Sequence, residues 1–176
     1  MVLVLCLGLV AGIVRSGNAP WHQRAYEGSI PARSLRLPGD RLAASDHISP
    51  RFPSPDELHG SPMALVVTCL SCRSGDVLGG FLGRMGVNDV PSGIDLRVVA
   101  IDGDPAVWRR TWGVPNRWKV HVAKGRDGVQ LVRQALRTGE SGQLQIYDSN
   151  LRWRASWHLG QLNIDGVRHD LSLAAS

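Results

Sequence analysis

Two cysteines, separated by two residues, are the side chains in this sequence best placed to do chemistry. Ala64–Arg73 reads Ala-Leu-Val-Val-Thr-Cys-Leu-Ser-Cys-Arg, an apolar, β-branched run followed at once by the pair. This pattern predicts a buried strand that ends at Cys69 and a helix that begins there. Unpaired N–H groups and the positive end of the dipole at a helix start favour the thiolate, which is the nucleophilic form of cysteine. We therefore expect Cys69 to attack, and Cys72, one turn along, to close a disulfide or resolve a mixed one.

The cysteine pair could instead be structural, either as a permanent disulfide or as two buried thiols. The strand and helix predicted on either side favour the redox interpretation. Arg73 would add a positive charge that favours the Cys69 thiolate, although an arginine beside such a motif is more typical of an ordinary surface position.

Metal binding is a second interpretation of the pair, because two soft thiolates suit Cu(I) and a histidine could complete the site. Three histidines lie near apolar segments, namely His59, His121 and His158, and none has ligand spacing to the cysteines. His121, inside a predicted strand, is more typical of a hydrogen-bonded core histidine. Zinc fits less well, because a structural zinc site needs four ligands and a second Cys-x-x-Cys is absent. We expect no cofactor.

The elements that must position the pair form a regular alternation from Met63 onward. The predicted strands are Met63–Thr68, Asp95–Ile101, Trp118–Val122, Gly142–Tyr147 and Leu151–Trp157. The predicted helices are Cys72–Met85, Pro105–Trp112 after an Asp104 cap, Gly128–Leu136 after an Asp127 cap, and Gly166–Leu173. This order predicts an α/β fold with a mainly parallel sheet, helices on both faces and an antiparallel terminal hairpin.

Two side-chain patterns predict what these elements bury. In the first helix one face carries Val77, Leu78, Phe81, Leu82 and Met85, while Gly75, Gly79, Gly80 and Gly83 weaken it. In the last strand Trp153 and Trp157 are offset by four residues, so they are expected to share a face with Ala155. Arg152 and Arg154 would then point to solvent.

The chain before Met63 differs in composition from the chain after it, which suggests that the protein consists of three parts. Residues 1–15 contain the uncharged run Val2–Val14, too short for the roughly 20 residues of a bilayer-spanning helix and close to a signal peptide or signal-anchor core. Residues 16–62 hold seven of the ten prolines and predict a tether or an extended wrap over the domain. A short helix is expected around Asp56–His59. Residues 63–176 would be the folded domain.

The overall composition excludes several classes of protein. The formal net charge of +5 comes mostly from arginines spread along the 176 residues, without a basic block, so we expect no nucleic-acid partner. Three cysteines cannot build a disulfide scaffold, and Cys6 lies alone in the apolar N-terminal run. The chain is expected to be exported, periplasmic or tethered outside the cytoplasm, with the cytoplasm as the alternative.

The order of elements, with Cys-x-x-Cys between the first strand and the first helix, resembles the thioredoxin-like superfamily. Trp118–Leu136 is similar to the extra strand and helix of TlpA/ResA-like thiol–disulfide oxidoreductases and of peroxiredoxins, and Ser141–Asp148 is similar to the RedB group. The resemblance spans about Met63–Gly160. It implies a thioredoxin-like fold with Cys69 and Cys72 as the redox pair, protein thiols or disulfides as substrates, a separate redox donor or acceptor, and a membrane tether.

Three features depart from that resemblance. Thr68 occupies the place of the usual aromatic residue before the first cysteine. The cis-proline that usually precedes the hairpin strand is replaced by Ser141-Gly142, and Val114-Pro115 lies one strand-helix unit too early to fill its role. The His-Pro and the closer cysteine pair of RedB-like sequences are also absent. Because the cis-proline helps dock substrate in these families, a redox-inactive binding module is a third interpretation.

Overall fold

The computed structural model describes residues 22–24, 46–135 and 143–176, which form a seven-stranded mixed sheet. In spatial order the strands are β1 (His22–Arg24), β7 (Trp153–His158), β6 (Gln143–Tyr147), β3 (Met63–Thr68), β4 (Asp95–Ala100), β5 (Trp118–Ala123) and β2 (Ile48–Ser49). Strands β3, β4 and β5 are parallel, while the others pair antiparallel with their neighbours. The predicted α/β class, with a parallel centre and a terminal antiparallel hairpin, is confirmed.

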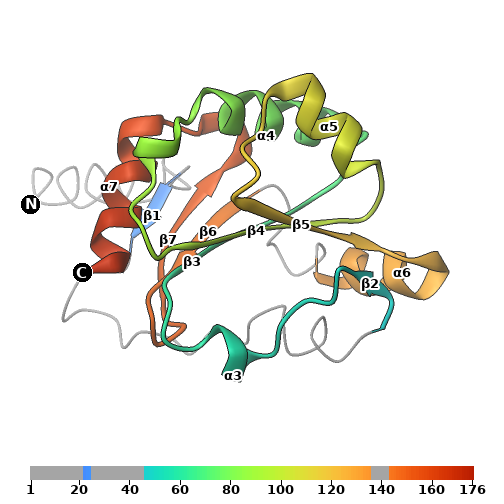
Figure 1. The fold of residues 1–176 in the computed structure, drawn as a ribbon, viewed down its shortest axis with the longest axis horizontal. Coiled ribbons are helices and arrows are strands. Elements are labelled where there is room, and N and C mark those ends of the chain that lie inside the picture. Colours follow the sequence, from blue (N-terminus) through green and yellow to red (C-terminus); the bar gives the residue numbers. More distant parts are fainter. Residues whose placement is uncertain (1–21, 25–45, 136–142) are drawn as a thin grey trace, which may run out of the picture.

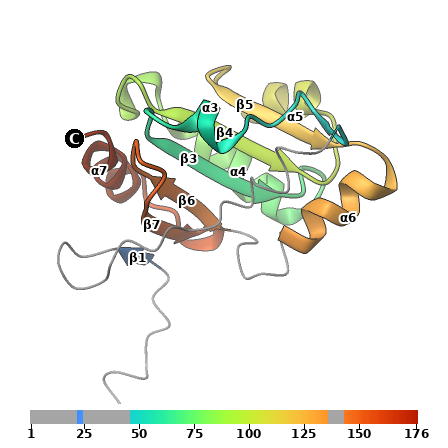
Figure 2. The ribbon, with the colours of Figure 1, turned by 90° about the horizontal axis from the view of Figure 1, so that it is seen from below.

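Helices cover both faces of the sheet (Figure 1). Helices α4 (Arg73–Arg84), α5 (Pro105–Trp112) and α7 (Ile164–Ala175) lie on one face, which we call the helical face. Helix α6 (Gly125–Ala135), the one-turn helix α3 (Pro55–Leu58) and strand β2 lie on the other, which we call the wrapped face; Figure 2 looks onto it, with α4 and α5 behind the sheet. Short 3-10 turns occur at Val87–Asp89 and Leu159–Gln161.

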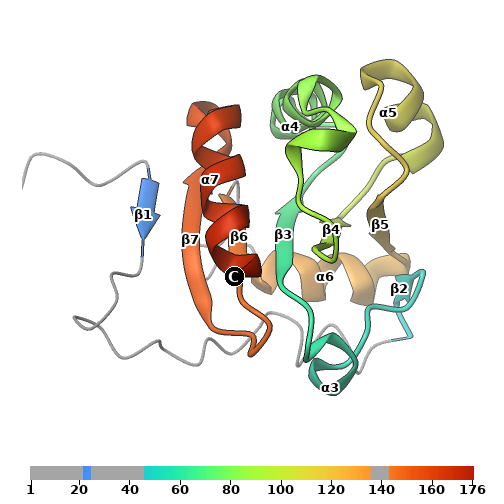
Figure 3. The same ribbon diagram turned by 60° about the vertical axis from the view of Figure 1, so that its left-hand side comes forward.

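The central strand β3 is buried along its whole length, as its continuous apolar run predicts. It lies between β4 and β6, and its parallel register with β4 places Thr68 opposite Ala100. The residues that follow the two strands therefore emerge at the same edge of the sheet. Figure 3 shows α4 and α5 above this edge.

Helix α4 packs against α5 through a row of glycines. Gly75, Gly79 and Gly83 recur at intervals of four, so they lie on one side of the helix. A Cβ atom at Gly79 would overlap the Trp112 ring, and one at Gly83 would overlap the Trp112 carbonyl oxygen. These glycines lower the helix propensity of α4, but they also let the two helices approach closely.

Most element boundaries agree with the sequence-based ones, and the exceptions have local causes. Helix α4 begins at Arg73 with Cys72 as its N-cap, and Val77 is 38% exposed instead of lying on the buried face. Helix α6 begins at Gly125, earlier than the predicted Gly128, because Gly125 has a positive φ of 63° and lets the chain turn directly after β5. Helix α7 is longer than predicted and begins after an Asn163 cap.

A β-bulge changes which residues of β7 share a face. Ala155 pairs with Ile146, but Trp153 pairs with the adjacent Tyr147, so Arg154 is an extra residue between the two pairs. Trp157 and Ala155 therefore lie in the core of the helical face, while Trp153 packs on the core of the wrapped face. The prediction that both tryptophans share a face is wrong.

The bulge also changes the environment of Arg154. Its guanidinium binds the Asp148 carboxylate with N···O distances of 2.8 and 2.9 Å, so this arginine does not simply point to solvent. Arg152, by contrast, is exposed as predicted.

The described part of the proline-rich segment packs on the domain. Phe52 and Leu58 are buried in the core of the wrapped face, and Ile48 pairs with Ala123 at the edge of the sheet. Ser54 and Glu57 form a capping box that starts α3. The Val2–Val14 run, Cys6 and Ser141-Gly142 lie outside the described residues. Among the residues that the structure describes, no helix is long and apolar enough to cross a membrane.

Candidate active site

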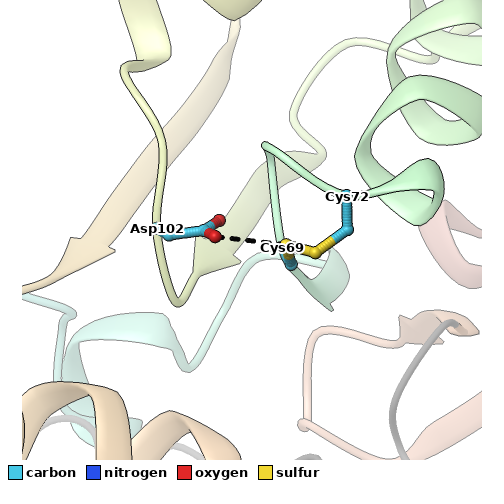
Figure 4. Close-up of side chains that lie close together, drawn as sticks. All are labelled: Cys69, Cys72 and Asp102. Atoms are coloured by element: carbon cyan, nitrogen blue, oxygen red, sulfur yellow. Dashed lines mark hydrogen bonds between the residues drawn. A yellow bond between two sulfur atoms is a disulfide. The ribbon is translucent and has the colours of Figure 1, made fainter.

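Cys69 and Cys72 are joined in a disulfide at the end of β3 (Figure 4). Their Cα atoms are 5.4 Å apart, within the range usual for disulfides. The structure thus brings together the two cysteines that the sequence singled out, at the edge of the sheet where β3 and β4 both end.

The two cysteines differ in their surroundings. Cys69 follows β3 directly and is 6% exposed, and the neighbouring Leu70 is buried in the core of the helical face. Cys72 is exposed and is the N-cap of α4, and its carbonyl oxygen accepts hydrogen bonds from the N–H groups of Gly75 and Asp76. The predicted helix start at Cys72 is therefore correct to within one residue, but the expectation that Cys69 lies at the helix start is wrong, because three residues of loop separate β3 from the N-cap.

Asp102 is a site residue that the sequence analysis missed. It lies in the loop after β4, and its Oδ2 atom is 3.3 Å from Cys69 Sγ. The same carboxylate accepts hydrogen bonds from the Ser71 hydroxyl at 2.5 Å and from the Ser71 N–H at 3.4 Å. A disulfide sulfur carries no hydrogen, so in the oxidised pair the sulfur only contacts the carboxylate. In the reduced pair the Cys69 thiol can donate a hydrogen bond to it.

The loop that carries Asp102 is shaped to fit against the cysteines. Gly103 has a φ of 88°, a conformation that side chains rarely adopt, and a Cβ atom there would lie 2.8 Å from Leu70 Cβ. Asp104 caps α5 by accepting hydrogen bonds from the N–H groups of Ala106 and Val107. The turn between β4 and α5 thus holds Asp102 in place from both sides.

Helix α4 holds the cysteine loop from its other side. A Cβ atom at Gly75 would overlap the carbonyl oxygens of Cys69 and Leu70, and the Trp108 indole N–H donates to the Gly75 carbonyl at 2.9 Å. Thr68, in the place of the expected aromatic residue, is buried and its hydroxyl donates to Ser74 Oγ at 3.1 Å. The loop therefore packs against the first turn of α4, which is itself hydrogen-bonded to β3 and to α5.

The same place holds side chains that could bind a metal ion. Within the described residues, a group of donors from Cys69, Cys72 and Asp102 lies within 4.8 Å of one another, and it includes no histidine. The sulfurs are joined to each other here, so they offer no thiolate charge to a cation. His59 and His158 are exposed, whereas His121 is buried with hydrogen bonds at both ring nitrogens, as expected of a core histidine.

No protein-family model matches the chain, and no curated protein matches its sequence. Solved structures do match its fold. DsbF of MTB, solved in its mixed oxidised and reduced forms, gives a TM-score of 0.52 at 14% identity over 84% of this chain and 100% of that chain. A thiol:disulfide interchange protein of the thioredoxin family from Chlorobium tepidum gives 0.50 at 11% identity over 69% and 84%.

The likeness agrees with the architecture described above. Strands β4, β3, β6 and β7 lie side by side in that order, the cysteine pair follows the central parallel strand β3, and helices cover both faces. The protein therefore has a thioredoxin-like fold.

Proposed function

We propose that this protein is a thiol–disulfide oxidoreductase whose redox pair is Cys69 and Cys72. The observation that carries the proposal is their disulfide, located where the central strand ends and α4 begins, with one partner exposed to solvent. The Asp102 carboxylate, 3.3 Å from Cys69 Sγ, also offers a hydrogen-bond acceptor to the thiol of the reduced pair.

The chemistry is a two-electron exchange. A thiolate of the reduced pair attacks one sulfur of a substrate disulfide, the substrate S–S bond breaks, and a mixed disulfide forms. The second cysteine then attacks the sulfur of the first, which releases the substrate as a dithiol and leaves Cys69 and Cys72 oxidised. The reverse sequence oxidises a substrate dithiol, and a separate thiol or disulfide protein resets the pair.

Protein thiols and disulfides are the substrates that this proposal favours, because Cys72 is exposed to solvent. The similarity of Ser141–Asp148 to the RedB group, and of the β5–α6 unit to TlpA/ResA-like proteins, supports the same substrate class. The apolar run Val2–Val14 supports a location outside the cytoplasm, with this run as the signal or tether. A fused alkaline phosphatase that stays inactive in cells would contradict that location.

Reduction of insulin by dithiothreitol tests the proposal. The wild-type protein should accelerate the precipitation of the insulin B chain. The Cys69→Ser and Cys72→Ser variants should each lose most of this acceleration, because the exchange needs both sulfurs. Cys6→Ala is the matched control and should keep full activity, since Cys6 is not one of the two cysteines of the proposed redox pair. A Cys72→Ser variant as active as the wild type would rule out this function.

A further inference from the structure

We propose that the reduced Cys69–Cys72 pair binds a zinc ion, with the Asp102 carboxylate as the third ligand. This inference goes beyond the proposed function, because it requires only that the disulfide can be reduced. It also differs from a closed structural zinc site, which needs four protein ligands. The site inferred here has three protein ligands, which leaves the fourth position of the ion open to water or another ligand.

The three donors already lie close enough to share one metal ion. Cys69, Cys72 and Asp102 each offer one ligand atom, and these atoms lie within 4.8 Å of one another. The Asp102 Oδ2 atom is 3.3 Å from Cys69 Sγ, and Figure 4 shows the carboxylate facing that sulfur. A tetrahedral zinc ion with usual bond lengths places a sulfur and an oxygen ligand roughly 3.5 Å apart. The carboxylate therefore needs little movement to share an ion with Cys69.

The two sulfurs need a larger change, which the backbone allows. They are bonded to each other here, whereas two sulfur ligands of a tetrahedral zinc ion are about 3.8 Å apart. The Cα atoms of the two cysteines are 5.4 Å apart. Once the disulfide is reduced, rotation about the Cα–Cβ bonds can separate the sulfurs by this amount, so the main chain need not move.

Asp102 is held by hydrogen bonds that suit a metal ligand. Ser71 donates from its hydroxyl to Oδ2 at 2.5 Å and from its backbone N–H to Oδ1 at 3.4 Å. A carboxylate oxygen has two lone pairs, so Oδ2 can accept from Ser71 and still bind an ion. In metal sites such outer hydrogen bonds orient the ligand and raise the affinity for the ion. Ser71 would thus support the site without touching the metal.

The charges and the chemistry of the donors favour zinc over other cations. Two thiolates and a carboxylate carry three negative charges, which repel one another at this separation unless a cation offsets them. Zinc accepts both sulfur and carboxylate oxygen ligands. Cu(I) prefers soft ligands such as sulfur, whereas magnesium and calcium prefer oxygen. The combination of two sulfurs and one carboxylate oxygen therefore selects zinc.

Zinc binding and disulfide exchange exclude each other at this site. A dithiol reductant breaks the Cys69–Cys72 bond, becomes a disulfide itself, and passes two electrons and two protons to the pair. Zinc then forms two Zn–S bonds and one Zn–O bond, and the two thiol protons are released to solvent. Both sulfurs are now ligands, so the pair cannot form a disulfide until the ion leaves. Zinc should therefore protect the reduced pair from oxidation.

The zinc affinity of the reduced protein tests the proposal. All proteins carry Cys6→Ala to remove the third thiol, and each is reduced with dithiothreitol, desalted without oxygen and titrated with zinc against a chromophoric chelator. The Cys6→Ala protein should bind one zinc ion per chain. Asp102→Asn, which removes the charge but keeps an oxygen acceptor for Ser71, should bind zinc on the order of tenfold more weakly or worse. Asp76→Asn is the matched control, because Asp76 is an exposed carboxylate in the first turn of α4, and it should leave the affinity nearly unchanged.

Cobalt(II), used as a spectroscopic probe of the zinc site, gives a readout that a change in stability would not produce. The Cys6→Ala protein should show sulfur-to-cobalt charge transfer in the near ultraviolet and the intense visible bands of a four-coordinate ion. Asp102→Asn should keep the charge transfer from two thiolates but change the visible bands. Ser71→Ala should weaken zinc binding less than Asp102→Asn does, because it removes a hydrogen bond to the ligand and not the ligand itself.

Two results would overturn the proposal. Equal zinc affinities and identical cobalt spectra for Asp102→Asn and the Cys6→Ala protein would show that Asp102 is not a ligand. Zinc binding no tighter than that of a Cys69→Ser variant would show that the pair forms no site. Failure of the proposed function gives a different result, because the insulin assay contains no added zinc. A protein that binds zinc through all three residues but does not accelerate insulin reduction would refute the oxidoreductase function and support the metal site.

Discussion

The elements that cover the two faces of the central sheet are held there by different kinds of interaction. On the helical face α4, α5 and α7 cover an apolar core, and the closest contacts join the glycines of α4 to the tryptophans of α5. On the wrapped face α6 and residues 46–62 cover a smaller apolar core that contains a buried ionic cluster. The redox pair lies at the end of the strand that both faces share, and glycines of α4 and of the loop after β4 pack against the cysteine loop.

The ionic cluster on the wrapped face is centred on Arg97. Its guanidinium binds Asp95 at 2.6 Å, donates to His121 Nε2 at 2.8 Å and lies over the Phe52 ring. A guanidinium has no acceptor atom, so Nε2 must be the acceptor, and the proton of neutral His121 is on Nδ1, which donates to the Pro50 carbonyl at 2.8 Å. The cluster therefore ties residues 50–52 to β4 and β5.

The two faces therefore have different roles. The helical face positions the site, and the wrapped face holds residues 46–62 on the domain. The helical face holds the cysteine loop through steric fit, which does not depend on pH or salt. The wrapped face holds residues 46–62 through groups whose charge matters. Changes to the wrapped face should therefore alter stability more than cysteine reactivity, and changes along the glycine row should alter both.

The largest effect is expected from Arg97→Met. The arginine side chain is 9% exposed, and its loss leaves His121 Nε2 without its donor and Asp95 without its buried partner. Breaking such a pair should lower the free energy of unfolding by about 3–5 kcal/mol. Lys119→Met is the matched control, because Lys119 binds the same Asp95 at 2.7 Å but is 57% exposed, and it should cost less than about 1 kcal/mol. Urea unfolding curves measure both, and equal losses would contradict the burial argument.

A smaller effect, and one that reaches the site, is expected from Gly83→Ala. The added methyl group would overlap the Trp112 carbonyl oxygen and push α4 and α5 apart, which should cost roughly 1–3 kcal/mol. Gly80→Ala is the matched control on the same helix. Its methyl group would find only ordinary contacts, the nearest at 3.6 Å, so the gain in helix propensity should stabilise the protein by up to about 1 kcal/mol.

Thermal unfolding of both glycine variants tests this comparison, together with the rate at which the reduced cysteine pair of each reacts with the disulfide dithiodipyridine and releases thiopyridone. Gly83→Ala should change both quantities, whereas Gly80→Ala should leave the release rate unchanged. If Gly83→Ala stabilised the protein as Gly80→Ala does, the glycine row would not be a close contact.

These contacts show what could be predicted from the sequence. The strands and helices after Met63 could be predicted because continuous apolar runs and three-to-four spacing are local properties. The four-residue spacing of Gly75, Gly79 and Gly83 was also visible, and it could have indicated a helix contact instead of only a weak helix. The bulge at Arg154 could not be predicted, because it depends on which residues of β6 face β7.

The candidate site could be predicted only in part for the same reason. Cys69 and Cys72 are neighbours in sequence, so their pairing was evident from spacing. Asp102 is 33 residues from Cys69 and reaches it only because β3 and β4 are parallel and in register. A cysteine and an acidic residue that each lie within two residues of the end of neighbouring parallel strands are a usable signal for such a contact. The relative exposure of the two cysteines depends on how the loop between β3 and α4 packs against the rest of the domain, which is a tertiary property that the sequence pattern does not contain.

The smallest predicted effect is a pH dependence of the free energy of unfolding, which arises from His121 on the wrapped face. Burial lowers the pKa of His121, and the positive charge of Arg97 lowers it further, against the raising effects of the Pro50 carbonyl and Asp95. In the unfolded chain the same imidazole takes up a proton near a pH of about 6.5. Between that value and the lower folded pKa the unfolded state binds more protons, so the stability that His121 contributes is complete above about pH 6.5 and is lost as the pH falls.

Urea unfolding of the wild type and of His121→Gln between neutral pH and the acid range measures this contribution. The wild type should lose up to about 1.4 kcal/mol per pH unit more than the variant below the unfolded pKa, because one proton is linked to unfolding. Parallel pH profiles would mean that His121 is not held neutral by its surroundings. The rate of thiopyridone release from the redox pair should not change with the titration of His121. The groups that face this histidine, namely Arg97, Asp95, Lys119 and the Pro50 carbonyl, lie on the wrapped face, and the hydrogen bonds and ion pairs described for them do not involve the cysteine loop.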